Sequence, residues 1–109
     1  MQPNSFGKIS VPTPGTPVQV TTDKTIRANR IRFQNVIGET GHTFLGTSGL
    51  VKATFAGVIK DFWPTGAGGG VADSYEVVSA DGCDLLVPAE YFVDANNAAE
   101  GLIVSYWTR

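Results

Sequence analysis

The sequence predicts an all-β protein, an antiparallel β-sandwich or jelly-roll-like barrel of about eight short strands. Short apolar runs recur along the chain, and turn residues bound each of them. The 109 residues include 13 Gly and 6 Pro, which are distributed as breaks between the runs. Helical spacing of apolar residues is limited to one possible turn near the C-terminus. These observations together favour strands over helices.

The first 15 residues, "MQPNSFGKISVPTPG", predict an extended, Pro-rich N-terminal arm. Proline removes a backbone donor and fixes φ, which disfavours the interior of a sheet. Residues 16–109 then form a single β-sandwich domain, a size that supports one modest hydrophobic core.

The predicted strands begin with "VQVTT", in which Val18 and Val20 alternate with polar residues. In "TIRANRIRFQNV" the apolar alternation shifts by one position, so we expect a bulge near Asn29 and Arg30. The Gly-rich "PTGAGGG" predicts a flexible loop, and Asp81-Gly82 predicts a hairpin turn. The remaining predicted strands are "HTFLGT", "LVKATFAGVIKDFW", "SYEVVS", "LLVP" and "GLIVSYW".

The charge balance argues against nucleic-acid binding, because the net charge is −2 and such proteins carry a basic excess. The basic residues of "KTIRANRIR" therefore indicate a solvated or partner-facing strand. Cys83 is the single cysteine, which is consistent with folding in a reducing compartment. We find neither a signal-peptide pattern nor an apolar run of about 20 residues, and so expect no membrane contact.

The densest group of polar ligand types is Asp94, Asn96, Asn97 and Glu100 in "DANNAAEG". A calcium loop needs a central Gly and a Glu at the twelfth position, and this stretch has neither. Asx side chains also cap turns by bonding to nearby backbone, and Asp94 could cap a single helical turn here. We therefore expect the stretch to turn the chain, with an irregular calcium site or a sugar site as alternatives.

Catalytic patterns are weak, and we expect a protein that is not an enzyme and needs no cofactor or metal. His42 and Cys83 carry no nucleophile signature around them, and one His with one Cys cannot complete a zinc site. The stretch "GAGGG" lacks the Lys-Ser/Thr pair of a phosphate loop. A glycosidase would need two opposed carboxylates, and the sequence selects no pair from its candidates, which are Asp61, Asp73, Asp84, Glu90 and Asp94.

Adjacent aromatic residues occur three times, as Phe62-Trp63, Tyr91-Phe92 and Tyr106-Trp107. On a strand, neighbouring side chains point to opposite faces, so a core on one face cannot hold both members of a pair. Some of these aromatics are therefore expected to lie at an interface, where Trp and Tyr are common anchors.

Two stretches, "RANRIRFQNVIGETGHTFLGTSG" and "LLVPAEYFVDANNAAEGLIVSYW", resemble the small β-sandwich virion proteins of tailed bacteriophages, namely capsid decoration, cement or head-fibre proteins. The similarity covers roughly residues 16–107 and lies in the order of strands and turns. It implies a protein that folds in the host cytoplasm and adds to the exterior of an assembled capsid, often as a homotrimer. No catalytic residues are carried over by the resemblance.

The function expected on these grounds is a structural virion protein that bridges and stabilises subunits of the major capsid protein. The alternative is a carbohydrate- or receptor-binding module of a tail or head fibre, with Trp63 and the "PTGAGGG" loop as a stacking platform. The residues expected to contact the capsid are Phe6, Ile9, Val11, Arg27, Arg30, Arg32, Trp63 and Trp107.

Overall fold

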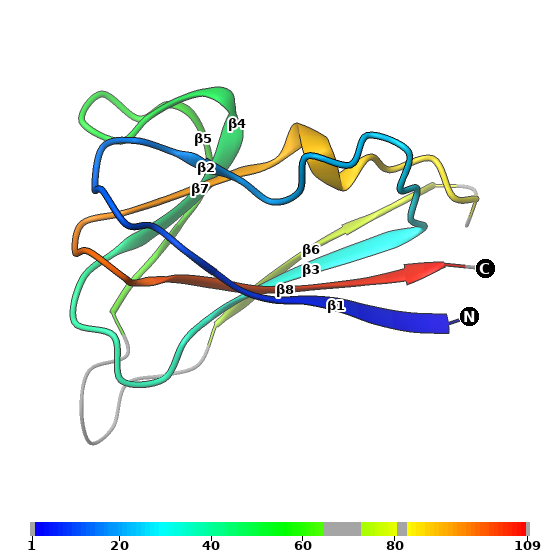
Figure 1. The fold of residues 1–109 in the computed structure, drawn as a ribbon, viewed down its shortest axis with the longest axis horizontal. Helices are drawn as coiled ribbons and strands as arrows, with labels where there is room; N and C mark the ends of the chain where they lie inside the picture. The colour runs from blue at the N-terminus through cyan, green and yellow to red at the C-terminus, as the bar shows by residue number, and fades with distance from the viewer. Residues whose placement is uncertain (1, 65–72, 81–82, 109) are drawn as a thin grey trace.

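A computed structural model describes residues 2–64, 73–80 and 83–108. They form two antiparallel four-stranded sheets packed face to face, which confirms the predicted β-sandwich (Figure 1). The first sheet has the order β1-β8-β3-β6 and the second the order β2-β7-β4-β5. The strands are β1 (Gln2–Ser10), β2 (Val18–Gln19), β3 (Arg30–Asn35), β4 (Thr43–Val51), β5 (Ala56–Phe62), β6 (Ser74–Val78), β7 (Phe92–Ala95) and β8 (Gly101–Thr108).

The core lies between the two sheets and follows the period-two alternation of the strands. Ile31 and Phe33 of β3 and Leu102 and Val104 of β8 point inward from the first sheet, each with 0% exposure. The second sheet supplies a matching layer of fully buried side chains, Leu45, Phe62, Val93 and Ala95. Burial of each larger side chain, such as Phe, Leu, Ile or Val, stabilises the fold by about 1.5–3 kcal/mol.

The bulge expected near Asn29 and Arg30 is replaced by a bend at Asn29, and β3 pairs from Arg30 onward without a register shift. Ala28 bridges to Leu86, whereas β3 from Arg30 onward pairs with β6 and β8. The chain thus changes its pairing partners at Asn29, which allows both Ala28 and Ile31 to be fully buried despite their odd spacing.

Residues 2–10 are extended, as their composition predicts, but they form β1 at the edge of the first sheet of their own chain. β1 pairs with β8 from Gln2 opposite Thr108 to Ser10 opposite Gly101, with a bulge between Ser5 and Gly7. Pro3 is tolerated because an edge strand leaves one side of its backbone unpaired. Figure 1 shows the two ends of the chain side by side and β1 continuing across the sandwich toward β2.

Residues 94–100 do not form the helical turn that the sequence suggests. Asp94 lies within β7, and its Oδ1 accepts hydrogen bonds from the N–H of Gly15 at 3.0 Å and of Ala95 at 2.7 Å. The chain then reverses through Ala98 and Ala99, with Ala99 at φ 67°, before β8 begins. The expectation that this stretch turns the chain is confirmed, while the Asp94-capped helix is corrected to a β7–β8 turn. The one helical segment among the described residues is a 3-10 turn, Pro88–Glu90.

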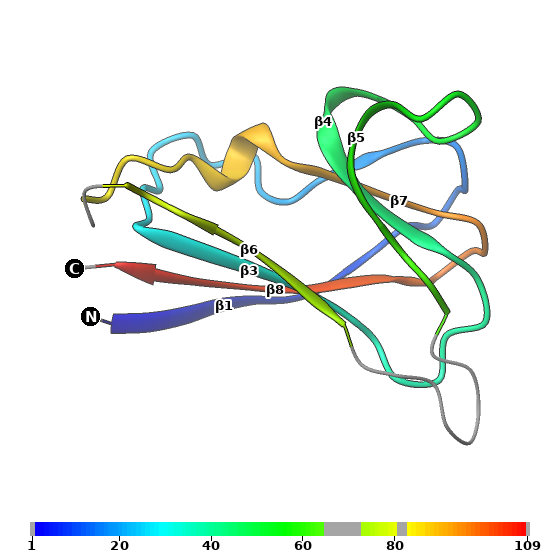
Figure 2. The ribbon, with the colours of Figure 1, turned by 180° about the vertical axis from the view of Figure 1, so that it is seen from behind.

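The edge strands β5 and β6 of the two sheets lie on the same side of the sandwich (Figure 2). Lys60 Nζ of β5 lies 3.0 Å from Asp73 Oδ2, just before β6, and so links the two edges. The predicted hairpin dipeptide Asp81-Gly82 and the loop "PTGAGGG" beyond Pro64 lie outside the described residues. Within the described part of the chain, no helix has the length and hydropathy needed to cross a membrane.

Candidate functional site: an aromatic surface on the second sheet

The side chains of Phe6, Ile9 and Val11 belong to the hydrophobic core of their own chain or pack against it. Val11 is 0% exposed, so its side chain presents no surface to a partner in this structure. Phe6 stacks on Tyr106 with ring centroids 4.7 Å apart, and Ile9 packs partly buried against the core. The burial has a simple cause, since pairing of β1 with β8 places these side chains over the edge of the sandwich.

Arg30, Arg32 and Trp107 lie together on the outer face of the first sheet. In β3 the inward residues Ile31 and Phe33 alternate with these two arginines, and Arg30 is opposite Trp107 of β8. The Arg30 guanidinium carbon is 5.6 Å from the centroid of the Trp107 ring, and Arg30 Nε is 3.7 Å from Glu76 Oε2. Arg30 therefore contacts both Trp107 and Glu76 on this face.

Arg27 lies apart from this face, in the loop before the bend. Its Nη1 donates to the backbone oxygens of Lys24 and, at 3.1 Å, Ile26. The "KTIRANRIR" stretch is therefore divided between a self-bonded loop and a strand face, and it is not one continuous basic surface.

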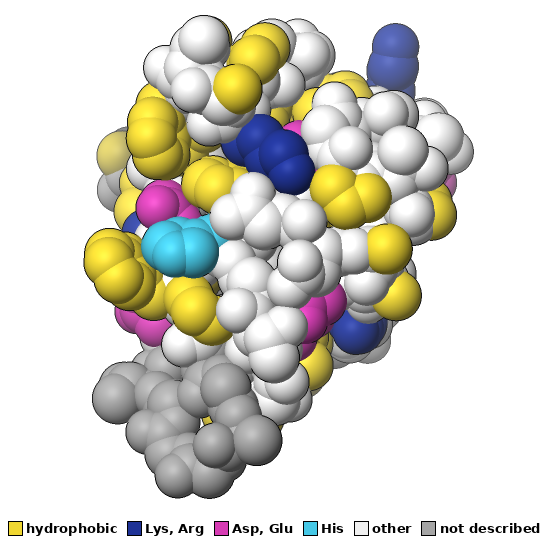
Figure 3. Space-filling view, turned by 90° about the vertical axis from the view of Figure 1, so that its left-hand side faces the viewer, with side chains coloured by type: hydrophobic (Ala, Val, Ile, Leu, Met, Phe, Trp, Pro, Cys, Tyr) yellow, Lys and Arg dark blue, Asp and Glu magenta, His cyan; other side chains and the backbone are white. Residues whose placement is uncertain are grey.

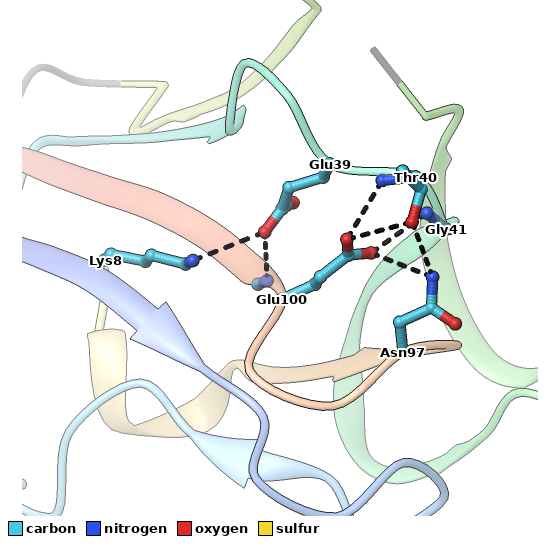
Figure 4. A network of polar contacts seen from close by, with 7 residues as sticks. Lys8, Glu39, Thr40, Gly41, Asn97 and Glu100 are labelled. Atoms are coloured by element: carbon cyan, nitrogen blue, oxygen red, sulfur yellow. Dashed lines mark hydrogen bonds and ion pairs between the residues drawn. The ribbon is translucent and has the colours of Figure 1, made fainter. Parts of the chain in front are cut away.

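Glu100 uses its carboxylate to hold the loop that leads into β4 (Figure 4). Its Oε2 accepts from the N–H of Thr40 and its Oε1 from the N–H of Gly41, both at 2.9 Å. The Asn97 amide lies 3.0 Å from Thr40 Oγ1 on the same side. Asp94 is occupied elsewhere, with Gly15 and Ala95. Asn97 and Glu100 therefore meet at the Thr40 loop, whereas Asp94 does not join them. No group of three or more His, Cys, Asp or Glu suited to a metal occurs among the described residues.

Glu39 lies beside Glu100 and is held from the other direction (Figure 4). Its Oε2 accepts from the N–H of Gly101 at 2.8 Å and is 3.5 Å from Lys8 Nζ, while its Oε1 is buried without a partner. Burial raises the pKa of Glu39; the Gly101 N–H and Lys8 oppose this rise, and the Glu100 charge adds to it. Desolvation also acts to raise the pKa of Glu100, but its hydrogen bonds from Thr40, Gly41 and Asn97 outweigh that effect and lower it.

We predict that Glu39→Gln flattens the acid side of the pH–stability profile. Because the folded state binds the Glu39 proton more tightly than the unfolded state, the stability contributed by this group is greatest in acid. It falls as the pH rises from the usual value of 4.5 through the raised pKa. Urea unfolding between pH 4 and pH 8 should therefore show the wild type losing stability relative to Glu39→Gln as the pH rises. A constant difference between the two proteins would contradict this assignment.

His42 is part of a row of rings on the outer face of the second sheet. Its ring centroid lies 4.9 Å from that of Trp63 and 6.3 Å from that of Phe44. Phe44 in turn meets Phe55 edge-on at 6.1 Å. The register explains the row, because Phe44 is opposite Asp61 in β5, and Trp63 follows two positions later on the same face. We call Trp63, His42, Phe44 and Phe55 the aromatic row.

Both ends of the aromatic row are open to solvent, with Trp63 71% and Phe55 58% exposed. Two further apolar residues near the row are exposed, Ile59 of β5 at 37% and Val51, which pairs with Ala56 next to Phe55, at 48%. Figure 3 shows the histidine of this face in the open, with hydrophobic and acidic side chains next to it. Exposed apolar groups that gather in this way mark interaction surfaces in soluble proteins.

One polar pair interrupts the aromatic row. His42 Nδ1 lies 2.8 Å from Asp61 Oδ1, and the two side chains are 30% and 26% exposed. A carboxylate accepts hydrogen bonds, so the proton of this bond sits on Nδ1. The sequence marked His42 and Asp61 only as weak catalytic candidates; what brings them together is the pairing of β4 with β5.

Phe55 has a backbone conformation that is unfavourable for a bulky residue. Its φ is 59°, in the left-handed region where a bulky side chain is strained by about 1–2 kcal/mol. The turn thus has an exposed aromatic residue at a position whose backbone conformation favours Gly. Strain of this kind tends to persist at functional sites.

We predict that Phe55→Gly leaves the free energy of unfolding unchanged or raises it by up to about 1 kcal/mol, because the relief of strain offsets the greater freedom of Gly in the unfolded chain. Thermal or urea unfolding measures the change. Phe44→Ala is the matched control, because Phe44 is 4% exposed and its loss should destabilise by about 3 kcal/mol. A similar loss for Phe55→Gly would show that the ring serves the fold and not the surface.

A pocket of about 450 Å³ lies elsewhere on the molecule and carries one carboxylate, Glu90. Gln19, Thr47 and Phe92 line it, with Lys24 and two further residues. It does not provide the two opposed carboxylates that a glycosidase would need. The aromatic row is therefore the stronger candidate for a functional surface.

Comparison with known proteins identifies no relative: neither a protein-family model, nor a curated protein, nor a solved structure matches this chain.

Proposed function

We propose that this chain is a structural virion protein of a tailed bacteriophage, a decoration protein that docks on the outside of the capsid and stabilises contacts between major capsid protein subunits. The observation that carries the proposal is the aromatic row with its apolar surroundings. The resemblance of residues 16–107 to small virion sandwiches supplies the kind of partner.

The aromatic row suits docking because it offers rings without long, flexible side chains. Trp63 and Phe55 are the most exposed rings of the row and lie at its two ends. Aromatic anchors of this kind contribute much of the free energy at protein interfaces. They bury a large apolar area and lose few rotamers when they do so.

The sandwich behind the row is rigid enough to present it. Phe44 is held between His42 and Phe55, and the inward neighbours Leu45 and Phe62 are fully buried. A surface built on paired strands changes little on binding, which lowers the entropic cost of association.

Association of the chain with itself, as a homotrimer, forms part of the proposal. A trimer places three copies of the aromatic row on one assembly, and weak single contacts then add to firm attachment. Location on the capsid exterior follows from the same role, and docking of this kind uses no cofactor.

A binding experiment with heads tests the proposal. Purified protein is mixed with heads assembled from the major capsid protein of the same phage, and co-sedimentation gives the affinity. Wild type should bind saturably, and the double variant Trp63→Ala/Phe55→Gly should bind at least tenfold more weakly.

Val78→Ala is the matched control, because Val78 is an apolar residue of β6 on the opposite sheet and is 56% exposed. It should bind like the wild type. Failure of the wild type to bind, or equal loss in the control, would contradict docking through the aromatic row. Light scattering of the free protein tests the trimer separately.

The alternative function, a carbohydrate-binding module of a tail or head fibre, would use the same Trp63 ring, whose exposure suits stacking on a sugar. Saturable signals on a glycan array that Trp63→Ala abolishes, combined with no binding to heads, would favour it.

A further inference from the structure

The end of the aromatic row at Trp63 differs from the rest in having hydrogen-bond acceptors beside it. Asp61 and His42 bond to each other at 2.8 Å through Oδ1 and Nδ1. Because the proton lies on Nδ1, the second oxygen of Asp61 remains available as an acceptor. Among the described residues, no other hydrogen bond or ion pair of the Asp61 side chain occurs.

The nearby cations of this chain do not neutralise Asp61. Lys60 pairs with Asp73 at 3.0 Å, and Lys52 Nζ donates to the backbone oxygen of Ala95 at 2.7 Å. A partner that covers this surface with apolar groups alone would therefore bury a carboxylate oxygen without a donor, which is costly.

The shape and charge of the site indicate which chemical group of a partner would bind there. The Trp63 ring offers a flat face with negative quadrupole potential, and the Asp61 carboxylate carries negative charge close by. A guanidinium is planar, positively charged and purely a donor, so it can stack on an indole and donate to a carboxylate at once. A lysine ammonium meets the charge but lacks the plane.

We propose that the docking partner inserts an arginine side chain at Trp63, stacking on the indole ring and donating a hydrogen bond to the free oxygen of Asp61. The inference rests on the proposed function, since the arginine belongs to the capsid surface. It makes Trp63 and Asp61 a joint recognition site and leaves Phe55 as an apolar contact at the far end of the row.

The proposed arginine contact is tested by combining chemical blocking of arginines on the heads with substitution of Asp61 in this protein. Heads are treated with 1,2-cyclohexanedione, which blocks arginine side chains and can be reversed with hydroxylamine. Acetylated heads, with blocked lysines, serve as the comparison. Binding of the wild type, Asp61→Asn and Glu76→Gln to each preparation is measured by co-sedimentation. Glu76 is the matched acidic control, because it lies on the outer face of the first sheet.

On untreated heads, Asp61→Asn should bind about tenfold more weakly than the wild type, and Glu76→Gln should bind normally, as expected for loss of one charge-assisted contact. Blocking arginine should weaken the wild type by at least tenfold and Asp61→Asn by threefold or less, with recovery after reversal. Acetylation should leave the wild type within threefold of its original affinity.

Three results would overturn the inference. The first is equal sensitivity of wild type and Asp61→Asn to arginine blocking; the second is loss of binding on acetylation alone. The third is a Trp63-dependent signal for a neutral sugar together with full head binding by Trp63→Ala, which would assign the ring to a glycan. The first two leave docking intact, whereas absence of wild-type binding to untreated heads overturns the proposed function itself.

Discussion

Replacing Gly101 by alanine is expected to lower the free energy of unfolding by about 3 kcal/mol or more, because the added carbon has no space. A Cβ at this position would lie 1.8 Å from the backbone oxygen of Ile9 and 2.8 Å from its carbonyl carbon. These are backbone atoms of the paired strand β1, so relief requires the edge strand to move. The same movement would disturb the hydrogen bond from the Gly101 N–H to Glu39.

Gly49→Ala is the matched control, since a Cβ there meets nothing within 4 Å. Its stability should change by no more than about 0.5 kcal/mol. Urea denaturation of the two variants measures the difference. If Gly101→Ala unfolds at the wild-type midpoint, the close approach of β1 to the start of β8 is not as described.

Truncation of Phe33 to alanine is expected to cost about 3–5 kcal/mol, a large share of the stability of a domain of this size. Phe33 is 0% exposed, and its ring lies 5.3 Å from that of Tyr91 across the core. Its loss leaves a cavity between the sheets that neighbouring strands cannot fill without changing register. Denaturant unfolding monitored by circular dichroism gives the value.

Phe33→Leu provides the comparison, because it keeps most of the buried volume and should lose only about 1–1.5 kcal/mol. Comparable losses for the two variants would mean that ring contacts with Tyr91 matter more than the volume of the cavity.

Much of the sandwich could be predicted from local patterns. Alternation in "RIRFQN" predicted a strand with Ile31 and Phe33 on one face, and "GLIVSYW" was predicted as a strand. The change of phase predicted an irregularity near Asn29 and Arg30, which the structure has as a bend at Asn29. These features depend on neighbours in the sequence. The order of strands in each sheet depends on distant pairings, such as β1 with β8, and no local pattern encodes it.

The same limit explains what sequence reasoning missed at the surface. Phe55 and Trp63 flank β5 at its two ends, whereas Phe44 lies in β4 and His42 directly precedes that strand. Only the β4–β5 register aligns them. Trp63 was predicted as an interface residue because it adjoins Phe62 in the sequence. Trp63 points outward and is 71% exposed, whereas Phe62 points inward and is 0% exposed. The exposure of Phe55 was not predicted. It follows from the positive φ of this residue, and no residue type in the turn indicates that conformation. The burial of Val11 was not predicted, because a Pro-rich composition is typical of a free arm even when the strand is paired.

The neighbouring ends of β1 and β8 have a practical consequence for use of the protein as a display scaffold. Gln2 is opposite Thr108, and both ends emerge on the right of Figure 1, whereas the face with the histidine in Figure 3 is the left-hand side. A cargo domain fused next to Gln2 or Thr108 would therefore extend away from the face that carries the histidine. Two different cargoes could be carried by one copy, one beside each of these strand ends, without covering that face.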